Sequence, residues 1–265
     1  MITIKSIDEI DLMRKANQID RDCLEMLGEH VKPGVTTKEL DKLAYDFIKK
    51  HNAEPSFLGF EGFPGSICAS INEEVVHGIP SKKRHLEEGD IISIDCGTIY
   101  KGYQGDAART FLVGNVAPEI KKLVDVTQQS FFEGIRDLKA GVRLGDLGHA
   151  IQSYTEGFGF GVVRDLVGHG IGREMHEDPS VPNYGTPGRG FRLRENMTIA
   201  IEPMITLGTW KVWQLEDGWT IVTQDNKPAA HYENTVWIRE DGVEVLSLNE
   251  EDKKTLGKLY NIELI

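Results

Sequence analysis

The stretch Leu86–Thr110, LEEGDIISIDCGTIYKGYQGDAART, decides the fold. Its apolar residues predict a strand over Ile91–Asp95. A turn containing Gly102 and Gly105 follows, and a second strand is predicted over Ala107–Val113. We expect the two strands to adjoin each other.

Each of these strands has an aspartate at one end, Asp95 on the first and Asp106 on the second. Successive side chains of a strand point to opposite faces, so Asp95 lies on the face opposite Ile92 and Ile94. A carboxylate among apolar residues is costly to bury as a bare charge. Two of them on adjoining strands suggest a cation between them, and the alternative is a pair of solvated carboxylates at strand ends.

The same pattern occurs again 107 residues later (193 − 86 = 107). Leu86–Asp95 aligns with Leu193–Glu202, LRENMTIAIE, so the carboxylate recurs as Glu202. Lys32–Val35 matches Lys139–Val142 at the same offset (139 − 32 = 107). A search for self-similarity therefore finds one long duplication. It predicts two halves related by a pseudo-twofold axis, with the two carboxylates meeting near that axis.

The composition is that of a globular chain of 265 residues with a net charge of −12. This charge argues against direct nucleic-acid binding, since only Lys82–Arg84 forms a basic cluster. The N-terminal residues contain no apolar signal-like region, and no run reaches membrane-spanning length. Three cysteines at unrelated spacings, Cys23, Cys68 and Cys96, do not predict a disulfide framework. A cytosolic location is expected.

Helix signals precede the strands in each half. Ser6–Glu9 and Thr36–Glu39 are capping boxes, and Pro118 favours the first turn of a third helix. A fourth helix is predicted from about Gly145 to Phe158. The end from Asn249 onward predicts either a short capped helix or an extended tail.

Between the second helix and the strands lies the glycine-spaced aromatic segment Phe57–Phe63, followed by Cys68. Such residues are either plain core or the lining of a hydrophobic substrate pocket. His77-Gly-Ile comes next and recurs as His169-Gly-Ile in the second half.

The second copy, Gly168–Pro179, contains His169 and His176, whose spacing suits neither one helical face nor one strand face. The glycines between them predict a turn that lets both rings converge. A final strand, His231–Ile238, carries Glu233 near its start and loosely parallels the strand that begins at Asp106.

These patterns collect four carboxylates and a histidine: Asp95, Asp106, His169, Glu202 and Glu233. Four carboxylates around one point cannot all stay ionised without cations, and two bridged divalent ions fit their number. Oxygen and imidazole ligands without thiolate favour Mn, Fe, Co or Zn. No GxSxG motif occurs and the cysteines have no obvious base partner, so metal-assisted hydrolysis is favoured over serine or cysteine hydrolysis.

Asp95, Asp106, Gly168–Gly172 with His176, Glu202–Pro203 and Glu233 together resemble the methionine aminopeptidases, over nearly the whole chain. The chain is most similar to type I, because no long insertion separates His176 from Glu202. The resemblance implies an α+β pita-bread fold, in which helices cover a central curved, mostly antiparallel sheet of two pseudo-twofold-related halves. It also implies a single catalytic domain over residues 1–265, with halves of roughly 1–115 and 116–265.

The implied activity is removal of the N-terminal methionine from newly made proteins and peptides whose second residue is small. A water activated by two divalent metal ions (Co, Mn, Fe or Zn) attacks the first peptide bond. The resemblance gives the metal ligands as Asp95, Asp106, His169, Glu202 and Glu233. It gives His77, His176 and Glu202 as catalytic, with Glu202 as proton shuttle. The substrate-binding residues are His77, His176, Phe57, Phe60, Phe63, Cys68, Met175 and Trp219.

The pocket departs from many relatives, which carry Tyr at the positions of Phe60 and Phe63, Cys at Phe57 and Phe at Met175. The partners implied are the N-termini of nascent polypeptides and peptides, with ribosome association suggested, no membrane and a monomeric state. Two alternatives remain: a proline-specific relative, which carries a further N-terminal domain, and a non-catalytic binding module that has lost its metals. The intact ligand set disfavours the second.

Overall fold

The computed structural model describes residues 2–264. The first two helices begin at the predicted capping boxes, where a Ser or Thr hydroxyl accepts a hydrogen bond from a backbone N–H and the Glu three residues later accepts one in return. The third begins at Pro118, as predicted. Asn249 caps the last helix, so the chain end is the capped helix and not the extended tail. The helices are α1 (Ile7–His30), α2 (Thr37–Lys50), α3 (Pro118–Ile135), α4 (Leu144–Glu156) and α5 (Glu250–Tyr260), with a short 3-10 helix, η1 (Phe60–Gly62).

Within residues 2–264, a nine-stranded sheet has the order β1-β4-β5-β14-β9-β7-β8, with β2 paired to β4 and β15 paired to β14. All these pairings are antiparallel. Two three-stranded sheets, β13-β10-β6 and β11-β12-β3, complete the strands. The strands are β1 (Glu54–Pro55), β2 (Ile67–Ile71), β3 (Glu74–Val76), β4 (Ile91–Tyr100), β5 (Tyr103–Leu112), β6 (Gly161–Val162), β7 (Gly168–Gly170), β8 (Glu177–Val181), β9 (Thr198–Ile201), β10 (Met204–Thr206), β11 (Val212–Gln214), β12 (Ile221–Thr223), β13 (Ala229–His231), β14 (Glu233–Ile238) and β15 (Val243–Val245).

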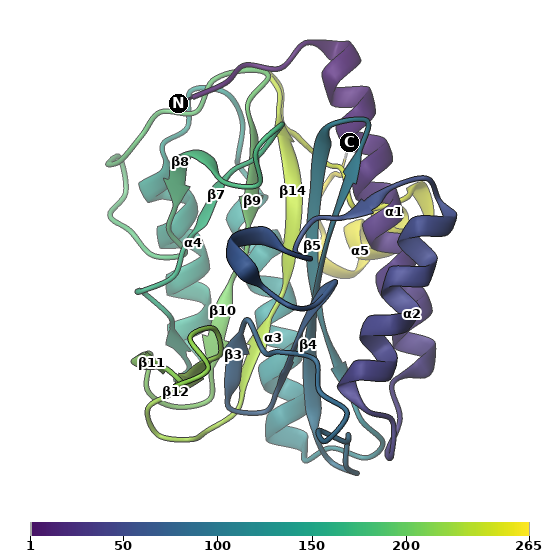
Figure 1. Cartoon of the computed structure of the whole chain (residues 1–265). Helices are drawn as coiled ribbons and strands as arrows, with labels where there is room; N and C mark the ends of the chain where they lie inside the picture. The colour runs from purple at the N-terminus through teal and green to yellow at the C-terminus, as the bar shows by residue number, and fades with distance from the viewer. Residues whose placement is uncertain (1, 265) are drawn as a thin grey trace.

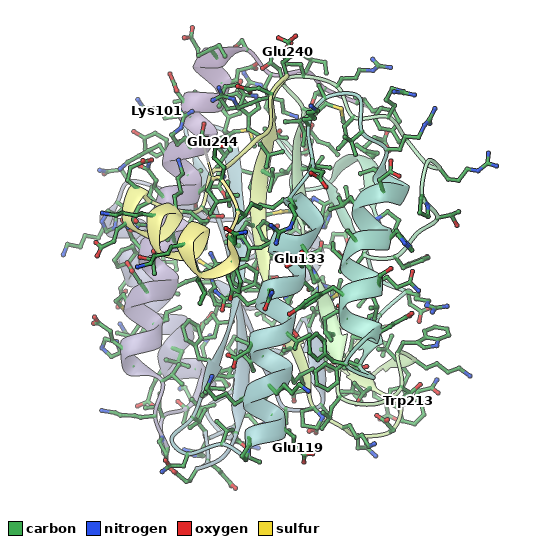
Figure 2. The ribbon with its side chains drawn as sticks, turned by 180° about the vertical axis from the view of Figure 1, so that it is seen from behind. Lys101, Glu119, Glu133, Trp213, Glu240 and Glu244 are labelled. Atoms are coloured by element: carbon green, nitrogen blue, oxygen red, sulfur yellow. The ribbon has the colours of Figure 1, made fainter. Side chains whose placement is uncertain are left out.

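Helices cover one side of the large sheet. Figure 1 shows α3 and α4 behind the strands, and Figure 2, seen from behind, shows them in front. Helices α1 and α2 share an apolar core with β2, β4 and β5, in which Leu40 and Ile94 are fully buried. Helices α3 and α4 form a second core with β9 and β14, in which Leu147 and Ile199 are buried. Each buried aliphatic side chain of this size stabilises the fold by about 1.5–3 kcal/mol.

The predicted strand pair is present as β4 and β5, but the connection is shorter than expected. The turn is confined to Lys101–Gly102, and β5 already begins at Tyr103. Gly105, which we expected in the turn, lies inside β5. A glycine is needed at this position because α1 packs directly on it. A Cβ added at Gly105 would lie 2.7 Å from the backbone nitrogen of Asn17. The glycine serves close packing and not chain reversal.

In the second half, the corresponding pair of strands is interrupted by other elements. Strand β9 is the repeat of β4 at the predicted sequence offset, and it pairs with β14. Between them the chain runs through β10 and the β11–β12 hairpin before it returns along β13. Strand β10 pairs with β13, which continues the β9–β14 ladder. Strands β5 and β14 pair at the centre of the sheet and join the two halves (Figure 1).

The mostly antiparallel sheet with helices confirms the predicted α+β class. The extent of a single domain over 1–265 stays a prediction, and its residues 1 and 265 lie outside the described part of the chain. None of the helices between Ile2 and Leu264 is long and apolar enough to cross a membrane.

Candidate metal centre

A cavity of about 170 Å³ opens beside the central strands. Every predicted site residue lines it, and so does Glu61, which the sequence did not single out. The lining residues are Phe57, Phe60, Glu61, Phe63, Cys68, His77, Asp95, Asp106, His169, Met175, His176, Glu202, Trp219 and Glu233.

Strand register brings three of the carboxylates to one face of the sheet. Asp95 on β4 and Glu233 on β14 are both Cα partners of Ala108 on the intervening β5. Asp106 lies two residues before Ala108 on the same strand and therefore points to the same face. Glu202 follows directly after β9, whose last residue pairs with Asn234 beside Glu233. The four side chains thus converge from four adjacent strands.

Burial dominates the electrostatics of these carboxyl groups. It raises the pKa of Asp106 to about 7. Burial, together with repulsion from Asp106, raises the pKa values of Asp95, Glu202 and Glu233 well above the usual range. Within residues 2–264, Asp95 Oδ1, Asp106 Oδ1 and Glu233 Oε1 are buried without a hydrogen-bond partner. Four clustered carboxylates, three of them with an unpaired oxygen, fit divalent cations, because only added positive charge lets all four ionise together.

His169 on β7 completes this cluster. Its Nε2 atom lies 3.6 Å from Asp106 Oδ2 and 3.8 Å from Glu202 Oε1. Its Nδ1–H donates to the Gly170 carbonyl oxygen at 2.9 Å, so the Nε2 lone pair faces the carboxylates. These separations exceed an N–H···O hydrogen bond. They suit two ligand atoms that are each about 2.1 Å from one ion, which lie roughly 3–4 Å apart.

His176 and His77 lie beside the carboxylate cluster. The rings of His169 and His176 are 4.4 Å apart, which confirms the predicted convergence. Burial, with a smaller effect of His169, lowers the pKa of His176 to about 4. Burial also lowers the pKa of His77. Both rings are therefore neutral near pH 7, each with an N–H to donate and a lone pair to accept.

The apolar end of the cavity is aromatic. Phe63 meets Trp219 edge-on with ring centroids 5.1 Å apart, and Phe60 meets His176 at 5.5 Å. Gly97 lets Phe57 pack closely against β4, since a Cβ added to Gly97 would lie 2.8 Å from Phe57 Cε1.

Cys68 lies opposite Asp95 in the β2–β4 pairing. Burial raises the pKa of its thiol well above the usual value. A neutral thiol is a poor nucleophile, which agrees with the preference for metal-assisted hydrolysis.

Two correspondences expected between the halves are wrong. His77 and His169 are not equivalent: His169 pairs with Ala200, the repeat of Ser93, and Ser93 pairs with Ser70. His77 instead follows β3 with a left-handed backbone (φ 61°). The shared His-Gly-Ile motif therefore reflects no common place in the sheet.

Glu233 likewise does not occupy the place of Asp106. Asp106 pairs with Gly97, whose repeat is Met204 (97 + 107 = 204), and Met204 pairs with His231. His231 is thus the counterpart of Asp106, and sequence reasoning missed it. The available signal was its position two residues before Glu233, on the same face of an extended segment.

Comparison with known proteins agrees with this geometry. Residues 11–240 match the sequence profile of metallopeptidase family M24. The chain is 60% identical over 250 residues to methionine aminopeptidase of Clostridium acetobutylicum, covering 94% of this chain and 100% of that protein. It is 50% identical to methionine aminopeptidase 1 of Bacillus subtilis, covering 93% of this chain and 99% of that protein. The crystal structure of methionine aminopeptidase from Thermotoga maritima superposes with a TM-score of 0.92 at 46% identity, covering 94% of this chain and 100% of that one. These likenesses confirm the pita-bread fold.

Proposed function

Because the chain belongs to metallopeptidase family M24, we propose that its site removes the N-terminal methionine from proteins and peptides. The protein is a metallo-aminopeptidase, a hydrolase of the first peptide bond. The observation that carries this function is one cavity with two distinct ends. Buried carboxylates and His169 form one end, and an aromatic slot around Phe63 and Trp219 forms the other.

We assign two divalent ions, Co, Mn, Fe or Zn, to the polar end. Their ligands are Asp95, Asp106, His169, Glu202 and Glu233. The unpaired buried oxygens of Asp95, Asp106 and Glu233 support this assignment. Bound there, the ions supply Lewis-acid activation of a water for attack on the first peptide bond.

The protein side chains orient the substrate and move protons. The methionine side chain enters the slot between Phe57, Phe63 and Trp219, where its sulfur gains contacts with aromatic rings. The neutral ring of His176 donates a hydrogen bond to the carbonyl oxygen of the scissile bond. Glu202 accepts the proton of the attacking water and delivers it to the leaving amine. His77, beside Trp219, crowds the second residue of the substrate and restricts it to a small side chain.

The natural partners we propose are the N-termini of nascent chains, met in the cytosol by a monomer associated with the ribosome. This follows from the substrate, since such N-termini emerge during synthesis. Light scattering of the purified protein and co-sedimentation with ribosomes test it. A stable dimer, or no co-sedimentation at low salt, overturns the corresponding part.

The test of the function combines metal depletion with a peptide series. Exhaustive chelation should abolish turnover of Met-Ala, and added Mn, Co or Fe should restore it. With metal present, Met-Ala, Met-Gly and Nle-Ala should be cleaved well, and Leu-Ala roughly 10–200-fold more slowly, the usual scale for one misfit methyl group. Met-Lys should be poor.

Each alternative has its own outcome in this assay. Preference for Xaa-Pro peptides would identify a proline-specific enzyme, and equal turnover of Met-Lys and Met-Ala a broad aminopeptidase. Metal-free protein without turnover of any peptide would identify a binding module. Full activity of verified metal-free protein would refute the two-metal assignment.

A further inference from the structure

His231 at the end of β13 is a buried imidazole without a hydrogen bond. Its side chain is 1% exposed. Among the atoms of residues 2–264, neither Nδ1 nor Nε2 finds a partner. Buried polar groups are nearly always satisfied, so a ring with both nitrogens unpaired indicates a binding partner that is not part of the polypeptide.

The Nε2 atom of His231 points at the carboxylate cluster. It lies 3.7 Å from Glu202 Oε2 and 3.6 Å from Glu233 Oε2. His169 Nε2 lies at 3.6 Å and 3.8 Å from its own two carboxylates. The two histidines thus approach the cluster at nearly the same distances.

These separations distinguish ligation from hydrogen bonding. An N–H···O bond is about 2.7–3.2 Å long, and His231 lies beyond that range from both carboxylates. Two ligands of one ion lie roughly 3–4 Å apart. The separations of His231 from the two carboxylates therefore fit those between ligands of one ion.

Among the described residues, two groups within the cluster have ligand atoms that all lie within 4.8 Å of one another, and Glu202 belongs to neither. One group is Asp106, His169 and Glu233, and the other is Asp95, His231 and Glu233. Glu233 belongs to both, as expected of a residue that bridges two ions. Each group contains one histidine.

We propose that His231 is a metal ligand, binding through Nε2 the ion held by Asp95 and Glu233. This inference rests on the proposed two-metal function and adds an imidazole to its second ion. Imidazole suits Zn, Co and Fe better than a purely carboxylate set does. The second ion should therefore favour Co or Fe over Mn.

The test counts coordinated imidazoles in the Co(II)-loaded protein. Each histidine bound to Co(II) gives a strongly shifted, exchangeable N–H signal in the proton NMR spectrum. Wild type should give two such signals, from His169 and His231. His231→Gln, which keeps a hydrogen-bond donor but is a poor ligand, should give one. His149→Gln is the matched control, because His149 is exposed on α4, and it should keep both signals.

Equilibrium dialysis against limiting Co(II) provides a second readout. One of the two ions should bind at least roughly 100-fold more weakly to His231→Gln, more than the 10–100-fold typical of losing a group that only orients a ligand. Its selectivity for Co over Mn should fall in parallel.

A single shifted signal in wild type overturns the proposal and makes His231 a residue that only orients Glu202 and Glu233. This wild-type count decides the question even if the variant fails to fold. Turnover of Met-Ala by wild type is measured separately. A protein with two imidazole signals and no peptidase activity refutes the proposed function and not the ligand.

Discussion

The two halves of this chain share a framework and differ in what they attach to it. Strands β4 and β9 align 107 residues apart (202 − 95 = 107), and Asp95 and Glu202 occupy equivalent places. In the first half, β4 turns at once into β5, whereas in the second half the β11–β12 hairpin separates β10 from β13. The repeat therefore produces the sheet and two of its site carboxylates, and the departures from it add the remaining residues of the site.

Equivalent positions show the difference directly. The first half has Gly97 paired with Asp106, where the second has Met204 paired with His231. Gly97 lets Phe57 and Met175 of the cavity wall pack closely against β4, whereas Met204 is fully buried in an apolar cluster. Glu233 corresponds to Ala108, its own Cα partner across the axis. The first half thus contributes the glycine behind the aromatic wall of the cavity, and the second contributes His169, His231 and Glu233.

Removing the carboxylate of Asp106, whose counterpart in the second half is His231, should have the largest effect. Asp106→Asn leaves fewer negative charges for two ions and should lower activity by more than ~10³-fold, with loss of bound metal. Metal analysis and Met-Ala kinetics on the same sample measure this. Asp125→Asn, a matched change on the exposed face of α3, should leave both unchanged. Full metal content with normal activity in Asp106→Asn would disprove its role as a ligand.

The next largest effects are expected at His169 and His176, and substitutions of these two histidines should differ in whether metal is lost. His176→Ala removes a hydrogen-bond donor to the reacting carbonyl, so kcat/KM should fall by roughly 10²–10³-fold while metal stays bound. His169→Ala should lose metal along with activity, although the two rings are 4.4 Å apart. Equal metal loss in both variants would show that His176 is also a ligand.

Local signals predicted most of the framework. The capping boxes at Ser6 and Thr36 act within one turn of helix, and the apolar run of β4 is typical of a strand buried on both faces, so neither needs tertiary information. The repeat then placed Asp95 and Glu202 together. The predicted metal ligands line one cavity because their strands are neighbours in the sheet.

What the sequence could not provide was register across long connections. The place of His231 depends on β10 pairing with β13 across the excursion Leu207–Pro228, and no local pattern determines that pairing. Gly105 was assigned to a turn because its contact with α1 is tertiary. His77 was matched to His169 by motif, although motif identity does not determine position in a sheet.

A third prediction concerns the close packing that Gly97 permits. The methyl group in Gly97→Ala would press on Phe57 Cε1 and on Met175 Cε, 2.8 and 3.0 Å from the new atom. Narrowing the slot should lower kcat/KM for Met-Ala by roughly 10–200-fold, the scale of one misfit methyl group. Turnover of Ala-Ala, whose side chain does not reach this depth, should change little.

The equivalent position provides the control. Met204→Leu keeps the volume of a core residue and should leave the Met-Ala to Ala-Ala preference intact. An unchanged preference in Gly97→Ala would place the methionine side chain elsewhere in the cavity.

The smallest effect is expected where the N-terminal arm, the residues before α1, contacts the second half of the chain. Lys5 Nζ contacts Glu177 Oε2 at 2.6 Å, beside the segment that carries His176, and Thr3 also donates to Glu177. Burial alone would raise the pKa of Glu177, but hydrogen bonds from Lys5 and Thr3 outweigh it and hold that pKa below the usual value. Burial lowers the pKa of Lys5 despite its ion pair with Glu177. The ion pair therefore stabilises the fold less than the lowered pKa of Glu177 alone indicates. Glu177→Gln should cost about 1–2 kcal/mol of unfolding free energy near pH 7.

The pH dependence of that cost gives the sharper test. A carboxyl whose folded pKa is depressed stabilises the fold fully above its unfolded pKa of about 4.3, and this contribution disappears as the pH falls through the folded value. Urea unfolding of metal-free wild type and Glu177→Gln should therefore differ near pH 7 and converge as the pH drops below about 4. The carboxylates of the site titrate in both proteins, so their effect cancels in the comparison. A difference that persists unchanged into acid would mean that the substitution acts through packing and not through the charge of Glu177. The N-terminal arm would then be held against the second half by packing and not by electrostatic attraction.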